Sequence, residues 1–144
     1  MFHVTRRYQF AASHRLHAAE LSEARNRELY GKCNNAHGHG HNYTVEVSAR
    51  GPLEASTGRA VDTERLDELV RREVVGPFDH RNPNTEIVAF QSAVPTSENL
   101  RYEICRRLKR HWKAAFPGEW PKLEKIRIVE TPRNIFEVAA DEIE

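Results

Sequence analysis

Alternating apolar and polar residues predict two strands in the first third of the chain. From Val4 to His14 the even positions form one largely apolar face, which is broken only by Arg6. Because successive side chains of a strand point to opposite faces, this pattern is typical of a strand that is buried on one side. A second alternating run extends from about Gly40 to Arg50, and the Gly51-Pro52 pair ends it.

Two longer segments follow the three-four spacing of amphipathic helices. The first begins after Asp62, a good N-cap residue, and is expected to end at Gly76-Pro77. The second begins with Thr96 or Ser97 as its cap and is expected to end at Pro117-Gly118. Both helices carry one apolar face, so we expect each to lie on a sheet.

The remaining segments complete the order of elements. Leu123 to Glu130 alternates again, and Ile135 to Ala139 predicts a last strand after a turn at residues 131–134. In the long polar stretch between the first two strands, Ser22 is expected to cap a short helix that ends near Glu28. Setting this short helix aside, the order is strand, strand, helix, helix, strand, strand. It predicts an α+β fold, with an antiparallel sheet and two helices on one face.

Length and composition narrow the classes of function. At 144 residues the chain is expected to form a single domain, residues 1–144. The 22 Lys and Arg residues balance 21 Asp and Glu residues, which gives no indication of a nucleic-acid or membrane partner. Apolar stretches are shorter than the roughly 18 residues of a spanning helix, and residues 1–6 do not resemble a signal peptide. We therefore expect a cytoplasmic protein.

Three histidines suggest a metal site. His39 and His41 are two residues apart, so in a strand they present two imidazoles on one side. If the segment ending at His14 pairs antiparallel with the segment beginning at His39, a third imidazole lies beside them. Three imidazoles and an open fourth position are typical of catalytic zinc. The alternative is that His39 and His41, between glycines, are solvated residues of a turn.

Several other residues are candidates for chemistry, each with a simpler alternative. Cys33 lies six residues before His39 and is a candidate base, a fourth zinc ligand or a packed cysteine. Asp79-His80 is either an acid-histidine pair or a solvated loop pair. Glu130 continues an apolar stripe, so it is either a strand end in water or a carboxylate that accepts hydrogen bonds from a ligand. Cys105 is expected to be a small buried side chain.

The motifs together resemble the 6-pyruvoyltetrahydropterin synthase and 6-carboxytetrahydropterin synthase family, and they extend in order over nearly the whole chain. The matching segments are Phe10-Ala11-Ala12-Ser13-His14-Arg15-Leu16-His17, Gly31-Lys32-Cys33-Asn34-Asn35, Gly38-His39-Gly40-His41-Asn42-Tyr43, Asp79-His80, Pro95-Thr96-Ser97-Glu98-Asn99 and Glu130-Thr131. The chain departs from the animal enzymes at Ala36-His37, where they resemble Pro-Asn, and at Ser97, where they have a second Thr. Neither change removes a reacting group.

The resemblance implies a fold, an assembly and a set of roles. The tetrahydropterin-synthesis fold is a four-stranded antiparallel sheet with two helices on one face, and three sheets close into a barrel. Two barrels stack as a homohexamer, a dimer of trimers, with active sites between subunits. The implied Zn²⁺ ligands are His14, His39 and His41; the implied base is Cys33, and the implied proton relay is Asp79 with His80. Glu130 would bind the pterin, assisted by Thr96, Ser97 and Glu98.

The resemblance also implies a lyase reaction with two candidate products. The pyruvoyl type converts 7,8-dihydroneopterin triphosphate to 6-pyruvoyltetrahydropterin with loss of triphosphate. The carboxy type makes 6-carboxytetrahydropterin for queuosine and other deazapurines. The five residues between Cys33 and His39 favour the pyruvoyl type, because the carboxy type usually has a shorter gap.

Two other classes remain as alternatives. A non-catalytic zinc-binding or pterin-binding protein would keep the histidines but lack the relay residues, which are present here. A zinc hydrolase would need a carboxylate base beside the metal, and neither of the first two strands supplies one next to its histidines.

Overall fold

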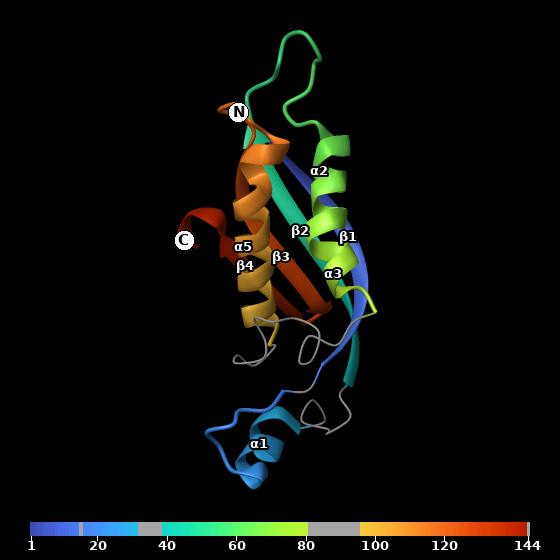
Figure 1. Ribbon diagram of the computed structural model, residues 1–144, viewed down its shortest axis with the longest axis vertical. Helices are drawn as coiled ribbons and strands as arrows, with labels where there is room; N and C mark the ends of the chain where they lie inside the picture. The colour runs from blue at the N-terminus through green and yellow to red at the C-terminus, as the bar shows by residue number, and fades with distance from the viewer. Residues whose placement is uncertain (15, 32–38, 81–95, 144) are drawn as a thin grey trace.

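The computed structural model describes residues 1–14, 16–31, 39–80 and 96–143 (Figure 1). Four strands form one antiparallel sheet in the order β1-β2-β3-β4. The strands are β1 (Phe2–His14), β2 (His39–Gly51), β3 (Lys122–Thr131) and β4 (Asn134–Ala139). The predicted α+β class and the predicted order of strands and helices along the chain are confirmed.

The helices lie mainly on one face of this sheet. Their bounds are α1 (Glu23–Tyr30), α2 (Thr63–Val70), the π-helical turn η2 (Arg71–Val75), α3 (Gly76–Phe78), α5 (Ser97–Ala115) and the 3₁₀ turn η4 (Ala140–Glu142). Figure 1 shows α2 and α5 side by side over the sheet, with α1 beyond its lower end. No helix in the described part of the chain is long and apolar enough to span a membrane.

Each predicted N-cap forms the expected hydrogen bond. The side chain of Ser22 accepts from the backbone N–H of Arg25, and that of Asp62 accepts from the N–H of Arg65. At the start of α5 the cap is Thr96, whose hydroxyl accepts from the N–H of Asn99 at 3.2 Å. Short polar side chains satisfy donors that the first helical turn leaves without partners, so the helix starts follow from local sequence.

The end of the first long helix differs from the prediction. The chain stays helical through Phe78, although Gly76-Pro77 was expected to end the helix. Pro77 has no N–H to donate, which normally interrupts a helix. Here the π-helical turn comes first, and the N–H of Gly76 donates to the carbonyl of Arg71, five residues back. The wider turn therefore brings Pro77 to the start of α3, where a missing N–H has no cost.

The core fills the space between the sheet and the helices. It consists mainly of fully buried aliphatic and aromatic side chains, among them Tyr43, Val45, Val47, Leu66, Leu69, Phe78, Leu100, Ile104, Leu108, Ile126 and Ile128. Cys105 is buried as predicted, and burial raises the pKa of its thiol. The apolar faces predicted from alternation in β1, β2 and β3 are the faces that meet the helices.

The opposite face of the sheet is polar. Glu46 of β2 is only 8% exposed there, because Arg7 of β1 and Arg127 of β3 each approach its carboxylate to 2.8 Å. Thr5 and Ser48 are joined by a hydrogen bond of 2.7 Å between their hydroxyls. Charged and hydroxyl pairs across neighbouring strands thus cover the side of the sheet that α2 and α5 do not.

Candidate active site

The first two strands pair in the register that the metal hypothesis requires. His14, the last residue of β1, lies directly opposite His39, the first residue of β2, and Ala12 lies opposite His41. Paired residues of an antiparallel sheet have Cα atoms about 4.5–5.5 Å apart. The backbone therefore brings all three predicted ligand positions to one end of the sheet. Of their side chains, the structure describes that of His41.

His41, Glu130 and Ser97 meet at this end of the sheet, although they come from three different elements. The Nε2 atom of His41 lies 3.5 Å from one carboxylate oxygen of Glu130. The hydroxyl of Ser97 donates a hydrogen bond of 2.9 Å to the other oxygen. The side chains of His41 and Glu130 are only 12% and 15% exposed. A predicted metal ligand and two predicted pterin contacts thus form one cluster.

The start of α5 explains why this cluster can hold a negative charge. Ser97 is the first residue of the helix and is buried, so its hydroxyl is fixed against Glu130 at the end of β3. The helix N-terminus carries partial positive charge, which favours a nearby carboxylate. Thr96 uses its hydroxyl as the helix cap, and Glu98 is exposed in the first turn. Of the three predicted assisting residues, Ser97 is the one that contacts Glu130.

Asp79 and His80 form a pair held against Ala11 of β1, at the outer edge of the sheet. The Asp79 carboxylate accepts from the N–H of Ala11 at 2.9 Å, and the N–H of His80 donates to the carbonyl of Ala11. His80 adopts a left-handed backbone conformation, with φ of 57°, and its Nδ1 atom lies 3.1 Å from Asp79. The bend at His80 is what allows two adjacent side chains to meet.

The contacts of Asp79 keep its carboxylate in the charged form. The Ala11 N–H and, secondarily, His80 hold the pKa of Asp79 below its usual range, so the carboxylate stays ionised near neutral pH. The His80 side chain is 82% exposed. An imidazole beside a fixed carboxylate and open to solvent can exchange a proton with a ligand or with water.

A shallow hollow of about 310 Å³ connects the two groups. It is lined by Ala11, Ala12, Gly40, His41, Asn42 and His80. His41 and His80 therefore line the same space, one from β2 and one from the segment after α3. Ala11 and Ala12 leave this space open because they are small. This role of Ala11 and Ala12 was not predicted from the sequence. The signal that could have indicated it is two adjacent small residues shortly before His14.

One predicted residue lies outside the described part of the chain. Cys33 falls within residues 32–38, so its expected role as base stays a prediction. The described residues contain no group of three or more metal-binding side chains. The side chains of His14 and His39 are not among those described, so the predicted zinc ligand set also stays a prediction.

The family model of 6-pyruvoyl tetrahydropterin synthase matches residues 3–141. The chain therefore belongs to the 6-pyruvoyl tetrahydropterin synthase family, as its motifs indicated. It is 40% identical over 132 residues to the 6-pyruvoyl tetrahydrobiopterin synthase of Drosophila melanogaster, covering 92% of this chain and 76% of that protein. It is 36% identical over 132 residues to the 6-pyruvoyl tetrahydrobiopterin synthase of Homo sapiens, covering 92% and 87%.

A solved structure confirms the fold. The 6-pyruvoyl tetrahydropterin synthase of Caenorhabditis elegans matches with a TM-score of 0.85 and 37% identity, over 96% of this chain and 94% of that one. The predicted tetrahydropterin-synthesis fold, a four-stranded antiparallel sheet with helices on one face, is thereby confirmed.

Proposed function

We propose that this protein is a zinc-dependent lyase that converts 7,8-dihydroneopterin triphosphate to 6-pyruvoyltetrahydropterin with loss of triphosphate. The relatives named above support the reaction class. The observation that carries the proposal is the contact of Glu130 with both His41 and Ser97. This contact places a carboxylate that can bind a pterin ring beside a histidine that can bind a metal.

Glu130 is the residue proposed to bind the pterin. The 2-amino-pyrimidine edge of a pterin presents neighbouring N–H donors, and a carboxylate can accept two such bonds in parallel. The hydroxyl of Ser97 holds one oxygen of Glu130 in place, so the carboxylate is oriented before a ligand arrives. Thr96 and Glu98, at the start of the same helix, remain proposed as further contacts.

Three imidazoles fit zinc better than the harder cations that prefer oxygen ligands. His14, His39 and His41, which the pairing of β1 with β2 brings to one end of the sheet, would hold the ion. When bound, zinc polarises the hydroxyl or carbonyl oxygens of the substrate side chain and makes the adjacent carbon more acidic.

The remaining residues are proposed to move protons. Cys33, as the thiolate, would remove a proton from a side-chain carbon while triphosphate leaves, and tautomerisation then yields the pyruvoyl group. Asp79 keeps His80 oriented at the edge of the hollow, where the imidazole would relay protons.

We further propose the homohexamer, with active sites between subunits. The exposed imidazole of His80 supports this arrangement, because it is open to a group from a neighbouring subunit. The sheet ends in the edge strands β1 and β4, which are the strands that closure into a barrel would join. The 6-carboxytetrahydropterin synthase reaction and a non-catalytic zinc-binding or pterin-binding role remain the alternatives.

Replacing Glu130 with Gln tests the proposed pterin site. Gln keeps the shape but turns one acceptor oxygen into a donor that faces another donor. We expect pterin affinity to fall by roughly 1.5–3 kcal/mol, which is about ten- to hundredfold. Isothermal titration calorimetry with a pterin measures this, and zinc content should stay at that of the parent. Equal pterin affinity in the parent and in Glu130→Gln would make Glu130 a solvated strand end.

Replacing His39 with Ala tests the zinc ligands, with Cys33→Ala as the matched control. We expect His39→Ala to lose stoichiometric zinc, because two imidazoles hold the ion far less tightly than three. Cys33→Ala should keep one zinc per chain yet lose about 10²–10⁴ in turnover, the usual contribution of a general base. Metal analysis that finds one zinc per chain in His39→Ala would refute the ligand assignment. Loss of zinc in Cys33→Ala would make Cys33 a fourth ligand.

A further inference from the structure

A second cavity, of about 550 Å³, lies at the other end of the sheet from the pterin site. Its walls are the loop between β2 and α2, the first turn of α2 and the segment from the end of α5 to β3. His41 is near the start of β2 and the loop follows its end at Gly51, so the two sites are roughly 33 Å apart along the strand. The cavity has the volume of a small-molecule site.

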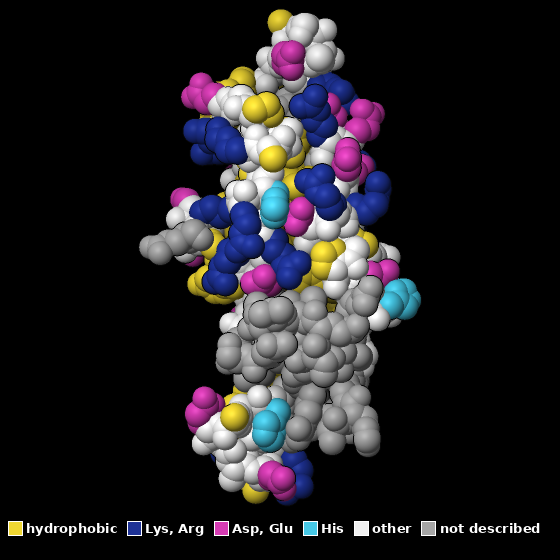
Figure 2. Space-filling view, in the orientation of Figure 1, with side chains coloured by type: hydrophobic (Ala, Val, Ile, Leu, Met, Phe, Trp, Pro, Cys, Tyr) yellow, Lys and Arg dark blue, Asp and Glu magenta, His cyan; other side chains and the backbone are white. Residues whose placement is uncertain are grey.

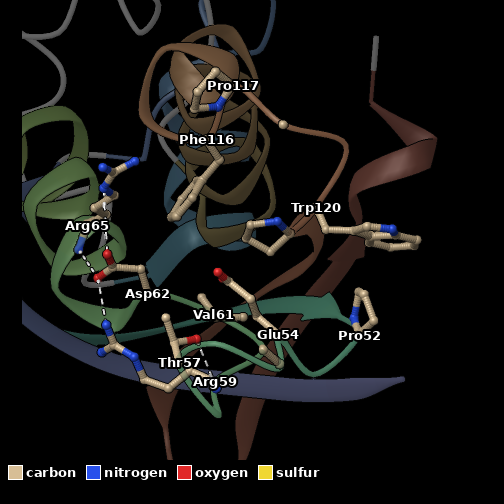
Figure 3. Close-up of a pocket in the computed structure, with 13 residues that line it drawn as sticks. Pro52, Glu54, Thr57, Arg59, Val61, Asp62, Arg65, Phe116, Pro117 and Trp120 are labelled. Atoms are coloured by element: carbon tan, nitrogen blue, oxygen red, sulfur yellow. Dashed lines mark hydrogen bonds and ion pairs between the residues drawn. The ribbon is translucent and has the colours of Figure 1, made fainter.

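One side of this cavity is apolar. Phe116 points into it from the end of α5 and is only 4% exposed, since its ring packs 4.8 Å from that of Trp112 (Figure 3). Pro117 and Pro121 extend the same wall. The Nζ atom of Lys122 lies 4.7 Å from the ring centre of Trp120, so one face of that indole is already covered. Phe116 therefore lies behind this wall, and the exposed Pro117 and the half-buried Pro121 form the surface open to an apolar group.

A second wall carries one net positive charge. Asp62 lies between two guanidinium groups, 4.0 Å from Arg59 and 3.6 Å from Arg65 (Figure 3). Arg65 also makes a long bond of 3.4 Å to the carbonyl of Ala115. A guanidinium has five N–H donors, and these few long contacts leave most of them for a ligand. The wall is suited to a carboxylate, which accepts two N–H bonds at once.

Glu54 supplies a negative charge to the same cavity. In Figure 3 its carboxylate points toward Phe116. One oxygen accepts a hydrogen bond of 2.7 Å from Ser56. Within the described part of the chain the other oxygen has no hydrogen-bond partner. The backbone of Glu54 is fixed, because its N–H donates to the carbonyl of Arg59 at 2.9 Å in a short antiparallel bridge. The free oxygen is suited to an ammonium group.

We propose that this cavity binds a free amino acid with a large apolar side chain. The α-ammonium group would bind Glu54, the α-carboxylate would bind Arg59 and Arg65, and the side chain would lie against Pro117 and Pro121. A simple anion would be repelled by Glu54 and a simple cation by the two arginines. A zwitterion with an apolar body satisfies all three surfaces.

Isothermal titration calorimetry with L-phenylalanine on the full chain tests this proposal. We expect saturable binding at one molecule per chain. Two analogues separate the charges, since 3-phenylpropanoate lacks the ammonium group and phenethylamine lacks the carboxylate. Each analogue should bind about ten- to hundredfold more weakly, because it loses charge-assisted bonds. Absence of saturable L-phenylalanine binding, or equal binding of either analogue, would overturn the proposal.

Two variants place the binding at this cavity. Glu54→Gln keeps the side-chain size, and Arg59→Gln leaves a shorter polar side chain. Each variant removes one charge from its wall, so each should weaken L-phenylalanine binding about ten- to hundredfold. The control is Glu28→Gln on the distant helix α1, which removes an exposed carboxylate and should leave the affinity unchanged. Unchanged affinity in Glu54→Gln, or an equal loss in Glu28→Gln, would contradict the assignment. Thermal unfolding of each variant confirms that it is folded.

Discussion

At the scale of single residues, a charged contact explains the one break in the apolar face of β1. Arg6 forms hydrogen bonds of 3.1 and 2.7 Å with Asp67 of α2, and the hydroxyl of Tyr8 donates to the same carboxylate at 2.6 Å. Chiefly through Arg6, these bonds lower the pKa of Asp67, while burial and the carboxylate raise the pKa of Tyr8. The cluster fastens the strand to the helix at the edge of the core.

Replacing Asp67 with Asn tests how the contribution of this carboxylate to stability depends on pH. The lowered pKa of Asp67 means that its carboxylate stabilises the fold above the usual value of 3.8, and that this contribution is lost as pH falls through the folded-state pKa. We expect Asp67→Asn to cost about 1–2 kcal/mol at pH 7, a value reduced for the partial exposure of Arg6. Urea unfolding at several pH values measures the difference.

The difference in unfolding free energy between the parent and Asp67→Asn should decrease below pH 3.8. The control is Asp141→Asn, which changes an exposed carboxylate of η4 and should leave the stability nearly unchanged throughout. A difference for Asp67→Asn that does not change with pH would show that the loss comes from shape and not from charge.

At this scale the sequence predicted which residues are candidates for the site, but it did not predict which residues contact one another. The spacing of His39 and His41 and the carboxylate of Glu130 were sufficient to select site candidates. The contact of Arg6 with Asp67 joins residues 61 positions apart, and it depends on where α2 lies on the sheet. The left-handed conformation of His80 was equally beyond prediction, because a non-glycine residue adopts it only when surrounding bonds hold it there.

At the scale of elements, the loop that forms the second cavity depends on one glycine. Gly58 has φ of 70°, a conformation that side chains rarely adopt, and its N–H donates to the carbonyl of Glu54 at 2.8 Å. The turn closes the short bridge between Glu54 and Arg59. The left-handed turn at Gly58 therefore sets the position of both charged side chains.

Gly58→Ala is expected to destabilise the fold by about 1 kcal/mol. The left-handed conformation costs an alanine roughly 1–2 kcal/mol, and the reduced freedom of the unfolded chain offsets part of this. An added Cβ would meet no atom within 4 Å, so the effect is conformational. In urea unfolding the control is Gly118→Ala, whose φ is not left-handed and whose Cβ would have ordinary contacts, so its stability should not fall. A Gly58→Ala variant as stable as the parent would contradict this account.

The starts of helices were predictable from sequence, while one helix end was not. Ser22, Asp62 and Thr96 act through the next three residues, so local sequence is sufficient to predict these caps. The helix ending at Phe78 continues past Gly76-Pro77 because a π-helical turn shifts the hydrogen-bond register. A pattern of apolar spacing does not show such a shift.

At the scale of the whole molecule, the two faces of the sheet differ in polarity. The face under α2 and α5 is apolar, and the other carries Glu46 between Arg7 and Arg127. The order of strands and helices along the chain was predictable, because alternation marks each strand. The pairing of β1 with β2 was a condition of the metal hypothesis, and the register that places His14 opposite His39 meets this condition. The proposed hexamer was not predictable from periodicity, because the pattern within one chain does not show which of its surfaces contact another subunit.

Incubating the purified, zinc-loaded protein with 7,8-dihydroneopterin triphosphate tests the proposed reaction most directly. Mass spectrometry of the pterin product decides between the candidate reactions, and protein stripped of zinc is the control. We predict 6-pyruvoyltetrahydropterin and one triphosphate per turnover, with activity lost on zinc removal and restored when zinc is returned. Formation of 6-carboxytetrahydropterin, or recovery of unchanged substrate from zinc-loaded protein, would contradict the proposed function.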